Sequence, residues 1–169
     1  MTTITEGRLT FTFPDQSTVD NYDDWSFYRN QFNSAFGGTK AVDLIYIAGS
    51  TTWLIEVKDY RVDRRTKAID LCEEVAIKVR DTLAGLVAAQ SNASQATEKD
   101  FAKKAIRARS IRVVLHLEQP RNPSKLFPSV IAPANAVLKL KQQLRGVDAH
   151  PKVVDQHSLQ PDMNWTVQG

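Results

Sequence analysis

Apolar and polar side chains alternate in several short stretches of the chain and follow a helical period in longer ones. Residues 40–58, K-A-V-D-L-I-Y-I-A-G-S-T-T-W-L-I-E-V-K, predict two strands joined by a tight turn at Gly49 to Thr51. Both strands are largely apolar on both faces, which is typical of a central sheet that is covered on each side.

The rest of the pattern places further strands and helices around this hairpin. Further strands are expected at residues 8–13, 111–118 and 152–155. Helices are expected at residues 20–36, 70–90, from 97 onward, and from 133 to the glycine at 146. We therefore expect an α/β fold, with a mixed central β-sheet flanked by helices, in a single domain spanning residues 1–169.

Composition and charge are those of an ordinary globular domain, with 42% hydrophobic and 24% charged residues. The net charge of +3 permits an anionic partner without demanding one. The single cysteine, Cys72, excludes an intrachain disulfide, and its place on an apolar helical stripe indicates a packing role. No apolar run is long enough to span a bilayer, and the N-terminus does not resemble a signal peptide. A cytoplasmic protein without a membrane partner is expected.

Three charged residues are set into the apolar hairpin, namely Asp43, Glu56 and Lys58. A charge inside an apolar sheet is unfavourable unless it is paired or bound to a metal. Because side chains alternate along a strand, Glu56 and Lys58 share a face, and Asp43 lies across from the end of the second strand. Two carboxylates form an oxygen-rich site suited to Mg²⁺ or Mn²⁺, and the lysine could position a water or stabilise charge on a phosphate.

This arrangement resembles the PD-(D/E)XK nuclease superfamily, in which an Asp on one strand precedes Glu-x-Lys on the next. The resemblance implies a restriction-endonuclease-like core and a metal-dependent phosphodiesterase, above all a DNA endonuclease. It implies that Asp43, Glu56 and the Val57 carbonyl hold Mg²⁺ (or Mn²⁺), and that Lys58 orients the attacking water. The sequence departs from the family pattern at Val42, where a proline is usual.

The same resemblance makes Asp24 a candidate for an additional acid, since the family often places one on the helix before the motif strands. The alternative is that Asp24 complements the dipole of that helix.

Basic residues follow the hairpin and predict contacts with a nucleic acid, DNA more than RNA. The candidates are Arg61, Arg64, Arg65 and Lys67 in the loop, and Lys78 on the next helix. The alternatives are a solvated loop and an ion pair between Lys78 and Glu74. The segment from Lys99 to Arg109 is the most basic of the chain and is either a solvated face or a DNA-facing patch. A homodimer is also left open.

Two functions from different classes follow from these residues. One is the metal-dependent nuclease. The other is a non-catalytic module on a decayed nuclease fold, which binds nucleic acid or protein and in which Glu56 and Lys58 pair with each other. Other chemistries lack their residues, because the three histidines are scattered and the sequence contains neither a glycine-rich phosphate loop nor a G-x-S-x-G motif.

Overall fold

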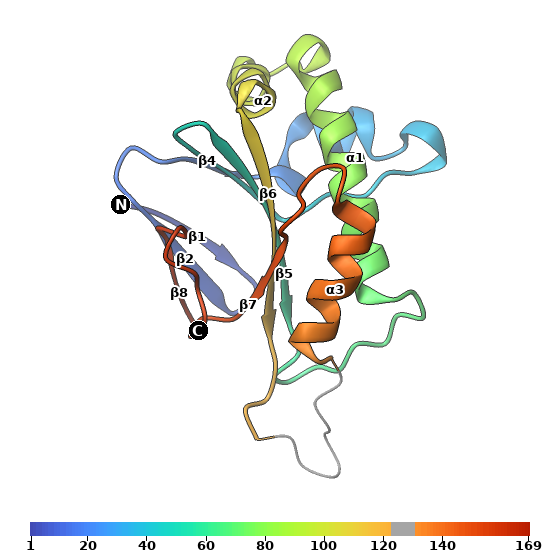
Figure 1. The fold of residues 1–169 in the computed structure, drawn as a ribbon. Coiled ribbons are helices and arrows are strands. Elements are labelled where there is room, and N and C mark those ends of the chain that lie inside the picture. The colour runs from blue at the N-terminus through green and yellow to red at the C-terminus, as the bar shows by residue number, and fades with distance from the viewer. Residues whose placement is uncertain (123–130) are drawn as a thin grey trace.

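The computed structural model describes residues 1–122 and 131–169, which form two β-sheets and three α-helices (Figure 1). The larger sheet has the order β3-β4-β5-β6-β7, with strands Thr18–Asn21, Leu44–Ala48, Thr51–Asp59, Ser110–Glu118 and Lys152–Val154. The smaller sheet has the order β1-β2-β8, with strands Thr2–Glu6, Leu9–Phe13 and Thr166–Gln168. The helices are α1 (Leu71–Asn92), α2 (Ala96–Arg107) and α3 (Pro133–Leu144).

The predicted hairpin is confirmed by β4 and β5, which pair antiparallel with Leu44 opposite Ile55. Gly49 occupies the turn with φ of 56°, a conformation that glycine adopts without a steric penalty. The chain then passes through α1 and α2 before β6 pairs parallel with β5, as a parallel connection requires a long crossover. The expected mixed sheet of an α/β fold is therefore confirmed, but the helices of the described residues flank only one of its faces (Figure 1), and the strand expected at residues 8–13 lies in the smaller sheet.

The larger sheet is the middle of three layers. Figure 1 shows α1 and α3 on one side of it and the smaller sheet on the other. Leu54 of β5 packs in the core on the helical side, whereas Trp53 and Ile55 pack in the core beneath the smaller sheet. The two-sided burial explains why these strands are apolar on both faces.

The helix predicted at residues 20–36 is wrong. Residues 18–21 form β3, and short 3-10 and π turns follow over residues 22–37. Side-chain acceptors replace the helical hydrogen bonds here. Asp20 accepts a hydrogen bond from the Trp25 indole at 3.0 Å, and Glu98 of α2 accepts from the main-chain N–H groups of Ser26 and Phe27 at 2.7 and 3.0 Å. The extra strand β3 covers the edge of the hairpin before the motif residues.

Among the helices of the described residues, none combines the length and the apolar character that crossing a membrane requires.

Helix α1 approaches the segment after β3 at a glycine. A Cβ added to Gly85 would collide with the hydroxyl of Tyr22 and lie 3.2 Å from Cδ1 of Phe32. Tyr22 is fully buried. We expect Gly85→Ala to lower the free energy of unfolding, because overpacking of about 1–3 kcal/mol outweighs the roughly 1 kcal/mol that alanine gains over glycine in a helix.

Urea unfolding checks this expectation. Gly146→Ala is the matched control, because an added Cβ there meets no atom within 4 Å, and its effect should stay within about 0.5 kcal/mol. A Gly85→Ala variant as stable as the parent would contradict the close packing of α1 on Tyr22.

Candidate functional site

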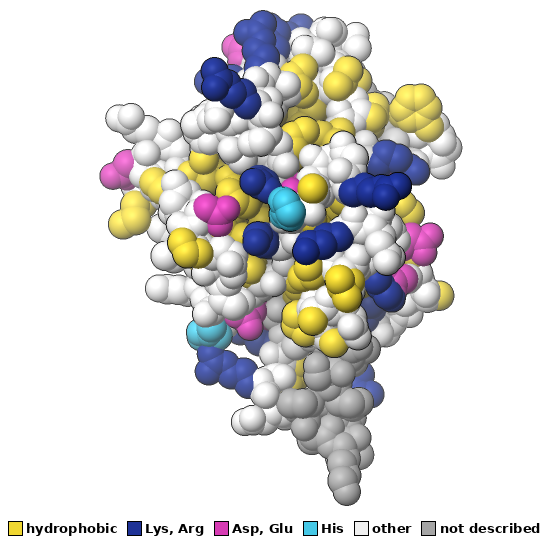
Figure 2. All heavy atoms as spheres, viewed as in Figure 1, with side chains coloured by type: hydrophobic (Ala, Val, Ile, Leu, Met, Phe, Trp, Pro, Cys, Tyr) yellow, Lys and Arg dark blue, Asp and Glu magenta, His cyan; other side chains and the backbone are white. Residues whose placement is uncertain are grey.

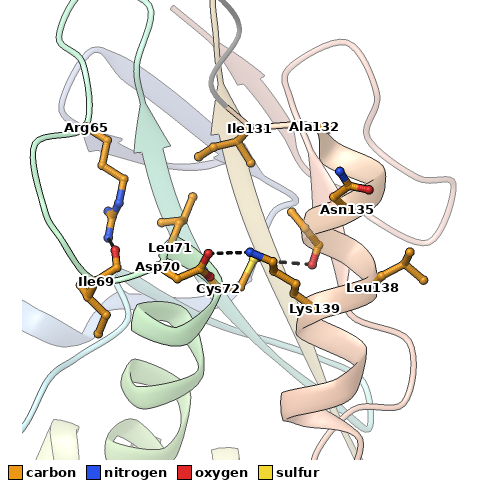
Figure 3. A pocket seen from close by; sticks show the side chains of 11 residues that line it. Arg65, Ile69, Asp70, Leu71, Cys72, Ile131, Ala132, Asn135, Leu138 and Lys139 are labelled. Carbon is orange, nitrogen blue, oxygen red and sulfur yellow. Dashed lines mark hydrogen bonds and ion pairs between the residues drawn. The ribbon is translucent and has the colours of Figure 1, made fainter.

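A hollow of about 520 Å³ lies between the start of α1 and α3 (Figure 3). Its lining is mostly apolar, and Asp70 and Lys139 form an ion pair at 2.7 Å across it. Of the site residues predicted from the sequence, Arg65 alone contributes to its wall. The charged residues of the hairpin gather elsewhere.

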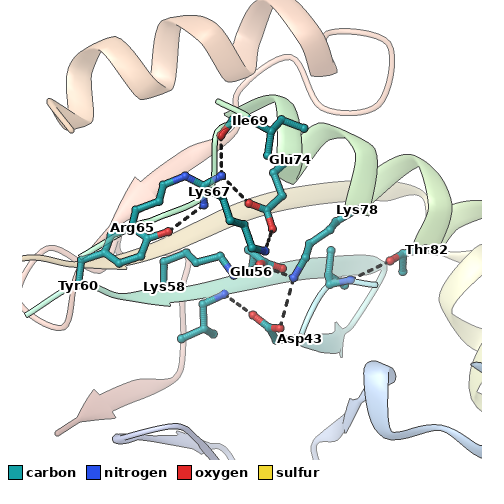
Figure 4. Close-up of polar contacts among 12 residues, drawn as sticks. Asp43, Glu56, Lys58, Tyr60, Arg65, Lys67, Ile69, Glu74, Lys78 and Thr82 are labelled. Atoms are coloured by element: carbon teal, nitrogen blue, oxygen red, sulfur yellow. Dashed lines mark hydrogen bonds and ion pairs between the residues drawn. The ribbon is translucent and has the colours of Figure 1, made fainter. Parts of the chain in front are cut away.

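The structure brings Asp43, Glu56 and Lys58 together at one end of the sheet, as the alternation predicts, and adds Lys78 from α1 (Figure 4). Glu56 Oε1 lies 2.6 Å from the Lys58 ammonium and 2.5 Å from that of Lys78. Lys78 also lies 3.7 Å from Asp43 Oδ1. We call these four residues the hairpin cluster. It contains two carboxylates and two ammonium groups, so its formal charges balance.

Helix α1 packs on one face of the larger sheet (Figure 1) and brings Lys78 to the cluster. Glu56 points to the helical side because it is two residues after Leu54 on β5. One turn after Lys78, Asp81 and Thr82 accept hydrogen bonds from the main-chain N–H groups of Lys40 and Val42, at 2.9 and 3.0 Å. The helix therefore fixes both the lysine and the segment that leads into β4.

Asp43 has a structural partner within the hairpin itself. Its Oδ2 accepts a hydrogen bond of 2.6 Å from the main-chain N–H of Val57, and the residue is buried. A buried carboxylate that accepts a main-chain hydrogen bond at the end of the β4–β5 ladder satisfies a donor that would otherwise lack a partner.

Burial dominates the electrostatics of the hairpin cluster. Burial and the nearby charge of Asp43 raise the pKa of Glu56 to about 7, against the lowering effect of Lys78 and Lys58. Burial alone would lower the pKa of Lys58, but the charge of Glu56 outweighs it and raises that pKa. The charged form of Glu56 is therefore unfavourable in this position except for its contacts with the two lysines.

Glu6, at the end of β1, is a further acid near the cluster that sequence reasoning missed. Burial and the charge of Asp43 raise its pKa to about 7. The sequence gives no motif at this position. Only the packing of the smaller sheet on the larger one brings the residue within electrostatic range.

Asp24 lies away from the hairpin cluster contacts. It ends a short 3-10 turn, its side chain is 58% exposed, and it forms an ion pair with Arg29. Any role as an additional acid stays a prediction.

Two acidic residues, Asp59 and Glu74, form ion pairs with most of the basic residues predicted to contact nucleic acid. Arg61 contacts both carboxylate oxygens of Asp59, at 2.9 and 2.7 Å. Arg65 and Lys67 contact the buried Glu74 at 2.6 and 2.5 Å. Although burial raises the pKa of Glu74, these two cations lower it to about 2. Arg64 is exposed. The predicted ion pair between Glu74 and Lys78 is replaced by these contacts and by the pairing of Lys78 with Glu56.

The hairpin cluster offers little room for the predicted Mg²⁺ or Mn²⁺. Glu56 Oε2 is buried without a hydrogen-bond partner among the described residues, as a carboxylate oxygen that holds a metal would be. The ammonium of Lys78, however, lies between the two carboxylates. Across residues 1–122 and 131–169, no group of three or more His, Cys, Asp or Glu residues has a geometry suited to a metal. The metal site at Asp43, Glu56 and Val57 stays a prediction.

A curated protein named cysteine–tRNA ligase, from Neisseria meningitidis serogroup A, is 39% identical to this chain over 174 residues. The similarity covers 85% of this chain and 25% of the ligase. The chain therefore spans about a quarter of the length of the curated relative it matches. Neither a protein-family model nor a solved structure matches the chain.

This similarity overturns the expected membership of the PD-(D/E)XK superfamily. The prediction of a Mg²⁺-dependent DNA endonuclease, and of a decayed nuclease as its alternative, is wrong, because the related stretch lies in a ligase. An Asp followed by Glu-x-Lys can also have a structural role. Here Asp43 and Glu56 form ion pairs with Lys78, and the resulting charge-balanced cluster connects α1 to the larger sheet. Any chemical role of Asp43, Glu56 and Lys58 stays a prediction.

Lys78 is the partner of two buried carboxylates, so its charge should matter for stability. We expect Lys78→Met to lower the free energy of unfolding by about 2 kcal/mol, because it removes a charged hydrogen bond and leaves Lys58 as the remaining cation beside Glu56. Lys104→Met, at an exposed position of α2, is the control and should change the value by less than about 0.5 kcal/mol. Equal melting of the two variants would show that Lys78 does not stabilise the fold.

The raised pKa of Glu56 predicts a pH dependence of stability. A carboxyl with a raised pKa contributes stability that is present below its ordinary pKa of 4.5 and is lost as the pH rises through about 7. Between about pH 5 and pH 8, the parent should therefore lose more unfolding free energy than Glu56→Gln, by on the order of 2 kcal/mol. Glu73→Gln, at an exposed position of α1, should keep the parent's profile. Parallel profiles of the parent and Glu56→Gln would exclude this account.

Proposed function

We propose that this chain is an RNA-binding domain related to part of a cysteine–tRNA ligase, and that it holds phosphates of a tRNA on the outer surface of α2. The observation that carries the proposal is the 39% identity over 85% of the chain to a protein whose name specifies tRNA. We assign binding, and not ligation, because the charged residues form a balanced internal cluster and a cationic surface.

Helix α2 is built to present cations. Ala102 and Ala105 are buried in the core on the helical side, and Glu98 anchors the start of the helix to the segment after β3. The other side carries the basic residues, which are Lys99, Lys103, Lys104, Arg107 and the following Arg109. Figure 2 shows Lys and Arg side chains gathered over α2. A surface of this kind binds a phosphate backbone without reading its sequence.

The cations of α2 are less engaged than those of the predicted loop. Within the described residues, one acid pairs with them, namely Asp100 with Lys103 at 3.5 Å. In the loop after β5, Arg61, Arg65 and Lys67 each contact a carboxylate at 2.7 Å or less. Pairing within the protein reduces the charge available to a phosphate, so α2 is the better surface.

One narrower expectation changes and two continue as proposals. The preference for DNA expected from the sequence gives way to the RNA proposal, and the experiment below compares the two nucleic acids. A homodimer as the assembly is open to measurement by sedimentation. A restriction-endonuclease-like order of the core strands concerns the fold alone and carries no activity with it.

The test is the affinity for tRNA, measured by fluorescence anisotropy over a series of salt concentrations. We expect Lys104→Gln/Arg107→Gln to weaken binding about tenfold and to reduce the log–log salt slope by about one unit for each phosphate that the protein no longer neutralises. Arg64→Gln/Lys67→Gln removes the same charge from the loop predicted from the sequence and should have the smaller effect. Duplex DNA of similar length is titrated in parallel.

An affinity for tRNA that the α2 pair leaves unchanged would refute the assignment of this surface. Tighter binding of DNA than of tRNA would refute the choice of RNA.

A further inference from the structure

We infer that the edge of the larger sheet formed by β6 and β7 carries a separate binding site for a phosphate ester, centred on Arg112 and Lys152. Its assignment to an RNA strand rests on the proposed function, whereas its affinity for a phosphate ester does not. The site lies outside the hairpin cluster and outside α2.

Sheet register places the residues of this site on one face. Trp53 of β5 pairs with Arg112 of β6, and Val114 of β6 pairs with Lys152 of β7. Paired residues point to the same face, and so do residues two apart on one strand. Trp53, Arg112 and Lys152 therefore share the face that the smaller sheet covers further along. They line a hollow of about 200 Å³ with Asp148, His150 and Asp162.

The side chain of Arg112 is held in position by an ion pair with Asp148. Its Nη1 lies 3.2 Å from Asp148 Oδ1. Asp148 is buried and also accepts hydrogen bonds of 2.9 Å from the main-chain N–H groups of Val113 and His150. The Arg112 side chain remains 39% exposed, so N–H donors that Asp148 does not use face the hollow and solvent. An anchored guanidinium loses little freedom when it binds an anion.

A second hollow of about 270 Å³ adjoins the first and shares His150 and Lys152 with it. Lys141 of α3 and Gln160 contribute to its wall. In the part of the chain that the structure describes, no carboxylate pairs with the side chain of Lys141, His150 or Lys152. The second hollow thus has an excess of positive charge from Lys141 and Lys152, whereas in the first hollow Asp148 and Asp162 balance Arg112 and Lys152.

Size and charge together indicate the ligand. Each hollow is smaller than the roughly 300 Å³ at which pockets for whole small molecules begin, so each suits one group of a larger ligand. Cationic donors from Arg112, Lys141 and Lys152 suit phosphate. Asp162, which also lines the first hollow, disfavours a bare anion but can accept a hydrogen bond from a sugar hydroxyl. A ribose phosphate satisfies both requirements, and adjoining hollows suit neighbouring phosphates of one strand.

The experiment is a titration of the isotope-labelled protein with adenosine 5′-monophosphate, followed by NMR. We expect saturable shifts of the Trp53 indole and of the Lys152 amide. Adenosine should not cause them, and inorganic phosphate should bind more weakly. Lys141→Gln/Lys152→Gln should weaken the nucleotide at least tenfold and keep the parent's melting temperature. Lys99→Gln/Lys104→Gln, with the same charge change on α2, should leave these shifts in place.

The outcomes separate this site from the proposed function. Nucleotide shifts that Lys141→Gln/Lys152→Gln abolishes, in a protein that does not bind tRNA, would support the site and refute the proposed function. Binding of tRNA without nucleotide shifts at Trp53 and Lys152 would refute the site and leave the proposed function standing. Inorganic phosphate that binds as tightly as the nucleotide would refute the assignment to an ester.

Discussion

The buried carboxylate of Glu56 is held by two ammonium groups from different layers of the molecule, and the position of α1 on the larger sheet depends on this contact. A buried charge without its partner is strongly unfavourable, so the helix cannot shift along the sheet without a large rise in free energy. Glu74 of α1 is held in turn by Arg65 and Lys67 from the loop after β5. The sheet thus pairs with Lys78 of α1, and the loop after β5 pairs with Glu74 of the same helix.

This internal pairing also decides where positive charge is available at the surface. The loop after β5 is rich in basic residues in the sequence, but Asp59 and Glu74 take up much of that charge in the fold. The cations of α2 and of the β6–β7 edge come from segments with fewer acids in contact. A count of basic residues along a chain therefore misplaces a binding surface whenever distant acids fold onto them.

The hairpin and α1 could be predicted because each has one dominant periodicity and clear end signals, such as Gly49 in the turn and Asp70 as the N-cap. β3 could not, because aromatic residues at helical spacing follow it. In the fold, Trp25 packs against Phe101 of α2, whereas Phe36 is largely exposed. His116 and Glu118 alternate with apolar residues as if they faced water, yet both are buried and lie 2.9 Å apart. Alternation shows which residues share a face and does not show whether that face is covered.

The hairpin cluster also shows what alternation along a strand can and cannot predict. Alternation was sufficient to group Asp43, Glu56 and Lys58. It could not show that Lys78 would reach them, because that depends on the crossing of α1 over the sheet. A short pattern of three charged residues fits a metal centre and an ion-paired core equally well, since both need opposite charges close together. Similarity over most of the chain, which reflects descent and not three side chains, overturned the nuclease family and leaves the metal centre a prediction.

The parallel pairing of β5 with β6 has a consequence for the speed of folding. Its two strands run side by side from Thr51 opposite Ser110 to Asp59 opposite Glu118, and the hydroxyls of Thr51 and Ser110 meet across 59 residues of sequence. Closing so long a segment reduces chain entropy before the strand contacts can compensate for it. The two helices between them can form early from local contacts, whereas the centre of the sheet must wait for this encounter. We therefore expect closure of the β5–β6 pair to be a slow step of folding, and until it occurs the β5 edge of the hairpin is unpaired.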